Sequence, residues 1–248
     1  TDEEVSCSND TICQATSVDR AITSVGERWE CKVEVNDSGF VENASTEVTV
    51  INTPPSIKDM SLEPASPKTE DNLSCSWRFN DLESSELNFT LEWFKDSLLN
   101  RTEEIQCINN TLCKSELLSN FTSFDESWEC RLKINDTGNI VTAVKNVKIG
   151  QTAPELRTMP QIFNEGMSAK TNAPYTNDVI ECLNGEYYDA DDDPHLNTEW
   201  RWYVNGTMKP NETGKFLNLS KENNGDEEDF ISCSQRVNDG NLWSQWYN

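Results

Sequence analysis

The sequence predicts an all-β chain of tandem β-sandwich domains whose two sheets are joined by disulfides. Three observations support this fold class: the chain repeats about every hundred residues, its apolar residues alternate with a period of two, and each complete copy places a tryptophan between two cysteines. A repeat of about a hundred residues has the length of one small β domain. The 248 residues therefore divide into two to three domains.

The repeat is clearest around the last cysteine of each copy. The first copy reads Trp-Glu-Cys at 29–31 and continues to a turn at 36–39, and the second copy shows the same order at 128–130 and 135–138. A third, looser copy closes at 233–240, again with Asn, Asp and Gly. Self-similarity at a fixed period marks the unit of folding, so each copy should form one domain.

Two proline-containing segments, 52–55 and 151–154, interrupt the strand-like patterns between copies. Proline fixes φ, and linkers of a few residues leave little freedom, so neighbouring domains should form a semi-rigid rod. The expected units are the C-terminal half of a sandwich domain at 1–53, a domain at 54–152, and a domain at 153–248 whose last strand is incomplete.

Period-two alternation predicts the strands themselves. Phe89, Leu91 and Trp93 alternate with polar residues, as expected of a half-buried strand, and the same pattern runs over 200–204. The Asn-Asp-Thr-Gly segment at 135–138 should form a hairpin turn, because Asn, Asp and Gly tolerate positive φ. No stretch of useful length has a helical period.

The cysteine order gives the most specific structural prediction. In the second and third copies, a cysteine, a tryptophan and a second cysteine follow one another along the chain. This is the order of the immunoglobulin sandwich, in which a bridge joins the two sheets and the indole packs on it. The predicted bonds are Cys75–Cys130 and Cys182–Cys233, and the predicted core tryptophans are Trp93 and Trp202.

Two further cysteine pairs stand close together in matching places of the first two copies. Cys7 with Cys13, and Cys107 with Cys113, should each close their own short loop. A zinc site would need two such pairs to converge, and the chain has a single histidine. We therefore interpret the four cysteines as two short disulfides and not as zinc ligands.

Cys31 is left over. It corresponds to Cys130, and no residue of this chain stands upstream in the place of Cys75, so we predict a partner outside this chain. Three explanations are open: the sequence is a window on a longer chain, a precursor is cleaved there, or another subunit donates the missing strands. We favour the first of these.

Nine cysteines favour an extracellular or cell-surface protein, because disulfides persist in oxidising compartments. Glycosylation triplets support the same location, since twelve are present where composition alone gives about five. N-linked glycans are therefore expected. The candidate asparagines are Asn9, Asn36, Asn43, Asn72, Asn88, Asn100, Asn109, Asn120, Asn135, Asn205, Asn211 and Asn218.

The net charge of −24 excludes some classes of partner. A negative field repels phosphate backbones and anionic lipid headgroups, so we expect no nucleic-acid partner. No run of about eighteen apolar residues occurs, so we expect no direct membrane insertion in this segment.

Enzyme motifs are missing from the sequence. The single histidine, His195, stands in a polar acidic turn, and the 44 acidic residues are too scattered to single out a catalytic pair. No Gly-rich phosphate loop or nucleotide fingerprint is present. We predict that the chain is not an enzyme and has no catalytic residues.

One acidic segment has the composition of a calcium loop. Several carboxylates in one loop suit a hard, oxygen-seeking ion, and extracellular calcium is concentrated enough to fill a weak site. The alternative is a solvated acidic loop, since the spacing differs from that of an EF-hand. The candidate calcium ligands are Asp189, Asp191, Asp192 and Asp193.

The cysteine and tryptophan order, the closing turns and the hundred-residue copies resemble the immunoglobulin-like and PKD-like tandem repeats of microbial, especially archaeal, cell-surface proteins. The segment 188–206 looks most like that group, although the Trp-Asp-Phe-Gly-Asp signature of PKD domains is absent. The resemblance covers the whole chain and implies that all three units are immunoglobulin-like.

A second resemblance concerns the segment 243–246. Its Trp-Ser-Gln-Trp order is similar to the tryptophan and serine box of type I cytokine receptors, and Arg236 could stack on these indoles. The final serine of that box is replaced by Tyr247. We interpret the segment as a strand with an aromatic face.

These observations favour an extracellular structural protein: a segment of a cell-surface filament, a surface layer or an adhesin stalk. Disulfides and glycans would stabilise and solvate it, and sheet edges would join copies of itself or neighbouring surface proteins. The alternative is a receptor-type or adhesin ectodomain that recognises a protein or sugar through its loops.

Overall fold

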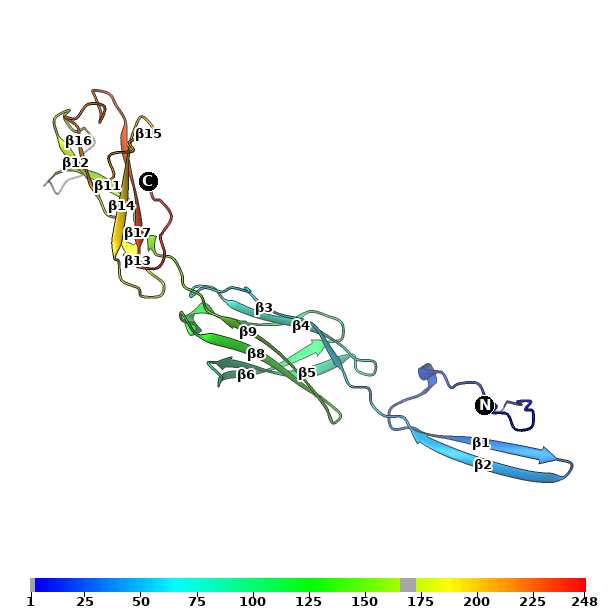
Figure 1. Ribbon diagram of the computed structural model, residues 1–248. Coiled ribbons are helices and arrows are strands. Elements are labelled where there is room, and N and C mark those ends of the chain that lie inside the picture. Colours follow the sequence, from blue (N-terminus) through cyan, green and yellow to red (C-terminus); the bar gives the residue numbers. More distant parts are fainter. Residues whose placement is uncertain (1–2, 166–172) are drawn as a thin grey trace.

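The computed structural model describes residues 3–165 and 173–248 and places three parts one after another along the chain (Figure 1). Two short 3₁₀ turns, η1 at Arg20–Ile22 and η2 at Ser119–Phe121, are the only helical elements among these residues. Strands form the other regular structure, so the all-β prediction is confirmed. In the described part of the chain, no helix is both long and apolar enough to cross a membrane.

The first part contains a single hairpin. Strands β1 (Arg28–Asp37) and β2 (Phe40–Thr49) pair along their whole length, from Arg28 with Thr49 to Asp37 with Phe40. The turn between them holds Ser38 and Gly39 at φ of 50° and 106°, which is the backbone of a tight hairpin turn. Neither outer edge of this two-stranded sheet is paired by a described residue.

The middle part is a two-sheet sandwich. One sheet has the order β3-β4-β7 and the other has the order β6-β5-β8-β9, with all neighbours antiparallel. Its strands are β3 (Ser56–Glu63), β4 (Leu73–Asn80), β5 (Glu86–Lys95), β6 (Leu98–Ile108), β7 (Cys113–Leu117), β8 (Ser127–Asp136) and β9 (Asn139–Lys148).

Alternation along the central strands builds the core of this sandwich. In β8 every second residue from Trp128 to Asp136 is buried, and β4 and β5 alternate in the same way. The largest side chains in the core are Trp77, Trp93 and Trp128, all fully buried. Each large apolar side chain withdrawn from water contributes about 2–3 kcal/mol, so these faces fix which side of each strand points inward.

The last part is a second sandwich with shorter strands. Its main sheets have the orders β11-β12-β16 and β15-β14-β17, and a small sheet pairs β10 with β13. Its strands are β10 (Glu155–Leu156), β11 (Gln161–Asn164), β12 (Val179–Leu183), β13 (Tyr187–Tyr188), β14 (Asn197–Val204), β15 (Thr207–Met208), β16 (Phe216–Asn218) and β17 (Ile231–Asn238).

Two buried clusters fill this part. Ile180, Trp202 and Leu217 pack with the disulfide between the main sheets. Leu156, Val237 and Tyr247 form a smaller cluster beside β10. The end of the chain packs against β17 in the second cluster, through Tyr247 and Val237.

The segment 243–247 is not the strand that we expected. Trp243 and Tyr247 make isolated bridges to Asn238 and Gln235 of β17. Arg236 lies over the rings of Trp243 and Trp246, with its guanidinium carbon 4.5 and 4.9 Å from the ring centres. The guanidinium stacks on the indoles as a cation on π faces, so the segment is joined to β17 by this stacking and by isolated bridges rather than by a continuous strand ladder.

Candidate functional site

The disulfides of the two sandwiches join their facing sheets. Cys75 on β4 is bonded to Cys130 on β8, and Cys182 on β12 is bonded to Cys233 on β17. Trp93 and Trp202 are both fully buried in the corresponding cores. The short pairs Cys7–Cys13 and Cys107–Cys113 are bonded as well.

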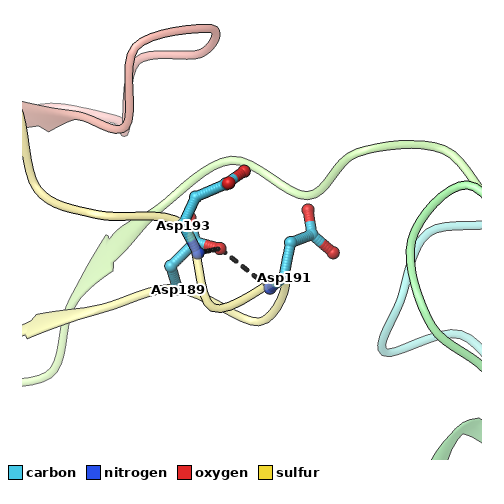
Figure 2. A group of neighbouring side chains, drawn as sticks. All are labelled: Asp189, Asp191 and Asp193. Atoms are coloured by element: carbon cyan, nitrogen blue, oxygen red, sulfur yellow. Dashed lines mark hydrogen bonds between the residues drawn. The ribbon is translucent and has the colours of Figure 1, made fainter.

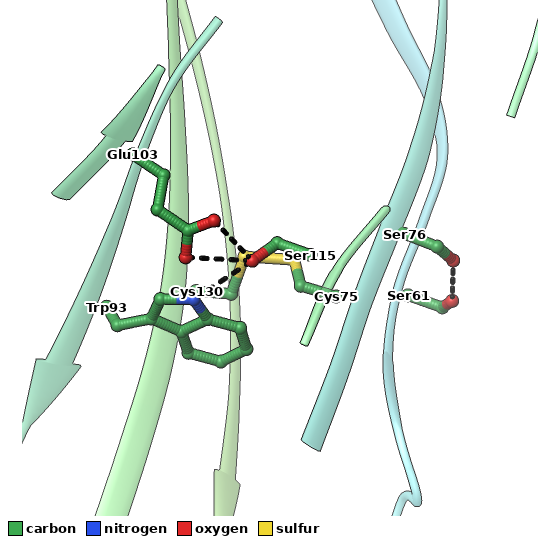
Figure 3. The surroundings of a disulfide bond; sticks show 7 residues. All are labelled: Ser61, Cys75, Ser76, Trp93, Glu103, Ser115 and Cys130. Carbon is green, nitrogen blue, oxygen red and sulfur yellow. Dashed lines mark hydrogen bonds between the residues drawn. A yellow bond between two sulfur atoms is a disulfide. The ribbon is translucent and has the colours of Figure 1, made fainter. Parts of the chain in front are cut away.

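Beside the Cys75–Cys130 bond lies a polar group that sequence reasoning missed (Figure 3). The Trp93 indole donates to Ser115 Oγ at 3.4 Å, and the Ser115 hydroxyl donates to the Glu103 carboxylate at 2.9 and 3.0 Å. The signal was present in the sequence, because Ser115 is the polar residue at an inward position of β7. These bonds give the buried indole N–H a partner.

The β1–β2 hairpin carries the one unpaired cysteine of the described residues, and Cys31 is exposed. Its face repeats the buried face of β8 position by position. Val33 and Val35 are 54% and 60% exposed, whereas their counterparts Leu132 and Ile134 are 0% and 2% exposed. The hairpin therefore carries on an exposed face the residue pattern that is buried in β8.

The acidic loop between β13 and β14 is organised around one buried carboxylate (Figure 2). Asp189 is only 6% exposed, and its Oδ1 accepts hydrogen bonds from the backbone N–H groups of Asp191 (2.8 Å) and Asp193 (3.2 Å). Its Oδ2 is buried and has no hydrogen-bond partner among the described residues. A buried carboxylate oxygen without a partner is costly, so this atom calls for a ligand or a cation.

Two further carboxylates of this loop reach across to the preceding linker. Asp191 accepts from the Thr69 hydroxyl of the middle sandwich and from the Thr152 backbone N–H at 2.6 Å. Asp193 accepts from the Gln151 side-chain amide at 2.7 Å. The loop is thus in direct contact with both the linker and the middle sandwich. These partners are distant in sequence, so no local pattern could have identified them.

The close spacing of these carboxylates shifts the pKa values of groups in the loop. Burial raises the pKa of Asp189, as do the Asp191 and Asp193 carboxylates, while the two backbone hydrogen bonds oppose the shift. Burial, followed by the charges of Asp189 and Asp239, raises the pKa of the neighbouring Tyr187 to about 12. The uncompensated charge in this region is negative, which suits a bound cation.

The structure brings together three of the four predicted calcium ligands. One carboxylate oxygen from each of Asp189, Asp191 and Asp193 lies within 4.8 Å of the others. Asp192 does not belong to this group: it is exposed, and its φ of 62° places it at the turn of the loop. The prediction that included Asp192 is corrected to the other three residues.

His195 is held by polar and stacking contacts. Its Nε2 lies within hydrogen-bond distance of Asn197 O and Thr198 Oγ1, and its ring stacks on Tyr187 with the ring centres 4.9 Å apart. A cavity of about 480 Å³ in the third part is lined mainly by apolar side chains such as Ile162 and Phe230. Its one acidic lining residue, Asp229, already accepts a backbone N–H and the Asn205 amide.

Most candidate glycosylation sites are exposed, but Asn109 differs. Its side-chain nitrogen donates to the carbonyl oxygens of Asp81 (2.6 Å) and Ser84 (3.1 Å), and its oxygen accepts from the Asp81 backbone N–H. Asn109 and Asn218 are both half-buried. The exposed candidates are Asn9, Asn36, Asn43, Asn72, Asn88, Asn100, Asn120, Asn135, Asn205 and Asn211.

We expect no glycan on Asn109 in native material. A glycan replaces one of the two amide hydrogens, and both hydrogens of Asn109 are used in bonds that hold the Asp81 loop. Site-by-site glycopeptide mass spectrometry measures this directly, with exposed Asn100 on the neighbouring β6 as the matched comparison. Full occupancy at Asn109 would show that this loop is open when the glycan is added.

Comparisons with known proteins give a general likeness only. No family model and no curated protein matches the chain. Among solved structures, the FN1–FN3 domains of chicken CNTN1 are 7% identical, with a TM-score of 0.32, over 90% of this chain and 74% of theirs.

A Ca²⁺-stabilized adhesin that helps an Antarctic bacterium bind ice is 11% identical, with a TM-score of 0.30, over 85% of this chain and 52% of that one. This chain therefore spans about half of the adhesin's length. Neither likeness bears on what the present chain does.

Proposed function

We propose that this chain is a structural segment of an extracellular surface protein, in which stacked immunoglobulin-like sandwiches form the stalk of an adhesin, a filament or a surface layer. The observation that carries the proposal is the open face of the β1–β2 hairpin. It has the residue pattern of a sandwich core and the position of an inter-sheet disulfide, yet it is exposed. Such a face is stable in water only when another sheet covers it.

The covering strands in this proposal resemble β3 and β4, which face β8 in the middle sandwich, and carry a cysteine in the place of Cys75. In both sandwiches of this chain the two halves come from one polypeptide, with bonded cysteines 55 and 51 residues apart. We therefore expect the same polypeptide to supply the partner of Cys31. The chain would then be part of a longer array of sandwiches.

Contacts at the first junction support a mechanical role. The Asn52 side-chain amide donates to the Asp136 carboxylate at 2.5 Å, and the Thr53 hydroxyl donates to Glu83 at 3.0 Å. At the second junction the matching linker residues, Gln151 and Thr152, bond to the acidic loop. Short linkers that are hydrogen-bonded to the following domain resist bending between domains.

Charge and covalent bonds support an extracellular location. Four bonded cysteine pairs belong to a protein that matures in an oxidising compartment. The net charge of −24 and ten exposed glycosylation triplets would keep a repetitive surface solvated. Its partners would be copies of itself or neighbouring surface proteins.

Non-reducing peptide mapping of native material tests the proposal. We expect the Cys31 peptide to be linked to a cysteine peptide from upstream in the same polypeptide, in stoichiometric amount. A partner from a separate chain would replace the linear array with a covalently joined assembly. A free Cys31 thiol in native material would contradict both models, because the hairpin would then lack its inter-sheet bond.

A ligand-binding ectodomain is the second candidate function. The cavity of the third part includes Phe230, which is 71% exposed. An exposed aromatic side chain beside an apolar cavity can anchor a protein or sugar ligand. Saturable binding of a glycan-array probe by the full chain, lost in Phe230→Ala, would favour this function, whereas concentration-dependent self-association without a ligand would favour the structural one.

A further inference from the structure

We infer that Asp189, Asp191 and Asp193 bind a calcium ion that fastens the third part of the chain to the linker and the middle sandwich. Unlike the structural role proposed above, this inference does not depend on what covers the β1–β2 hairpin. It depends on the oxygen atoms of one loop and on the contacts of that loop across the junction.

The first support is the state of Asp189. The side chain is 94% withdrawn from solvent, since it is 6% exposed, and its Oδ1 is fully engaged by two backbone N–H groups. The second oxygen, Oδ2, is buried and has no hydrogen-bond partner among the described residues, since the neighbouring Tyr187 hydroxyl donates to the Asp193 carbonyl oxygen at 3.0 Å. A cation beside this oxygen would compensate its desolvation and balance the neighbouring carboxylates.

The second support is the geometry of the three carboxylates. One oxygen from each residue lies within 4.8 Å of the other two. A point can therefore lie within about 2.8 Å of all three oxygens, and small side-chain adjustments would bring this to the 2.3–2.6 Å of Ca²⁺–O contacts. All donors are oxygens and none is Cys or His, which favours calcium over zinc or copper.

The third support is the set of hydrogen bonds that join the loop to the linker and to the middle sandwich. The other contacts of Asp191 are to Thr69 and to the Thr152 backbone, and Asp193 contacts Gln151. An ion that fixes these two carboxylates also fixes the orientation of the linker. Binding of calcium should therefore reduce motion at this junction.

The middle sandwich contains an internal comparison for the site. Asp81 has the same local geometry: its Oδ1 accepts from the N–H groups of Glu83 (2.9 Å) and Ser84 (2.6 Å), and its Oδ2 is buried without a partner among the described residues. No group of three converging acids includes Asp81 in the described part of the chain. A loop-capping role alone would make Asp81 and Asp189 equivalent, whereas a calcium site requires Asp189 specifically.

The binding test is isothermal titration of the calcium-free full chain with Ca²⁺. We expect one site with a dissociation constant of about 10⁻⁴ to 10⁻³ M, the range of extracellular calcium modules. Asp189→Asn keeps the oxygen that caps the loop and should weaken binding at least tenfold. The matched controls are Asp192→Asn, which removes the same charge from the same loop, and Asp81→Asn in the equivalent loop; each should bind within about twofold of the parent.

The coupling test is hydrogen exchange of the same proteins with and without Ca²⁺, after circular dichroism has shown that each variant is folded. Calcium should slow exchange at the Thr152 amide, which donates to Asp191, in the parent chain and in Asp192→Asn but not in Asp189→Asn.

Three outcomes would overturn the inference. Absence of binding up to about 10 mM Ca²⁺ would remove the site. An equal loss of calcium affinity in Asp192→Asn and Asp189→Asn would show that calcium only screens the charge of the acidic surface. Binding that leaves exchange at Thr152 unchanged would show that the ion does not fasten the junction.

Discussion

Removing the Cys75–Cys130 bond should lower the free energy of unfolding of the middle sandwich by about 4 kcal/mol. The bond closes a loop of 55 residues between the two sheets, and the entropy released to the unfolded chain grows with loop length. The double variant C75A/C130A tests this in urea-induced unfolding followed by tryptophan fluorescence, since Trp77, Trp93 and Trp128 report on this core.

A matched control exists within the same domain. The Cys107–Cys113 bond closes a loop of only 6 residues, and both sulfurs are buried as well. The variant C107A/C113A should therefore lose about 2 kcal/mol, roughly half as much. If both variants lost the same free energy of unfolding, local packing of the sulfur atoms would explain the contribution of these bonds, and chain entropy would not.

Trp128→Ala should lower the free energy of unfolding of the middle sandwich by about 3–5 kcal/mol, the usual range for deleting a fully buried tryptophan. The indole fills the end of the core on β8, and its N–H donates to the Glu126 carboxylate at 2.9 Å. Truncation leaves a cavity and removes a partner of Glu126. Chemical denaturation of the variant, monitored by the remaining tryptophans and by circular dichroism, measures the loss.

The first hairpin provides the control for this prediction. Trp29 holds the same position on β1, and its N–H donates to Glu27 at 3.1 Å, yet its ring is only half-buried. In the present chain Trp29→Ala should cost about 1 kcal/mol or less. In a protein where another sheet covers β1–β2, the cost should approach that of Trp128→Ala. An unchanged small cost there would contradict the proposal that the hairpin is half of a sandwich.

Much of the fold could be predicted because the relevant signals are local or periodic. Alternation at β5 and β8 identifies strands from a few residues, and the turn at 135–138 requires positive φ, which Thr137 and Gly138 adopt at 47° and 97°. The aromatic segment at 243–247 was the exception. Its composition favours a strand, but in the structure only isolated bridges to β17 form, beside the stacking of Arg236 on the indoles.

The candidate site was only partly predictable. Acid density marked the loop, but it could not separate Asp192 from its neighbours, because the turn at Asp192 directs that side chain to solvent. The burial of Asp189 and its unpartnered oxygen depend on packing against the rest of the domain. Sequence alone contains no measure of either property.

By itself the sequence determined the all-β class, the alternation of the strands and the hundred-residue repeat, because these depend on side-chain chemistry at short and regular spacing. Only the tertiary structure decided that Thr69, Gln151 and Thr152 meet the acidic loop, and that the core face of β1–β2 is exposed. The physical reason is that contacts across a domain junction, and the presence or absence of a covering sheet, depend on how distant segments come together in space.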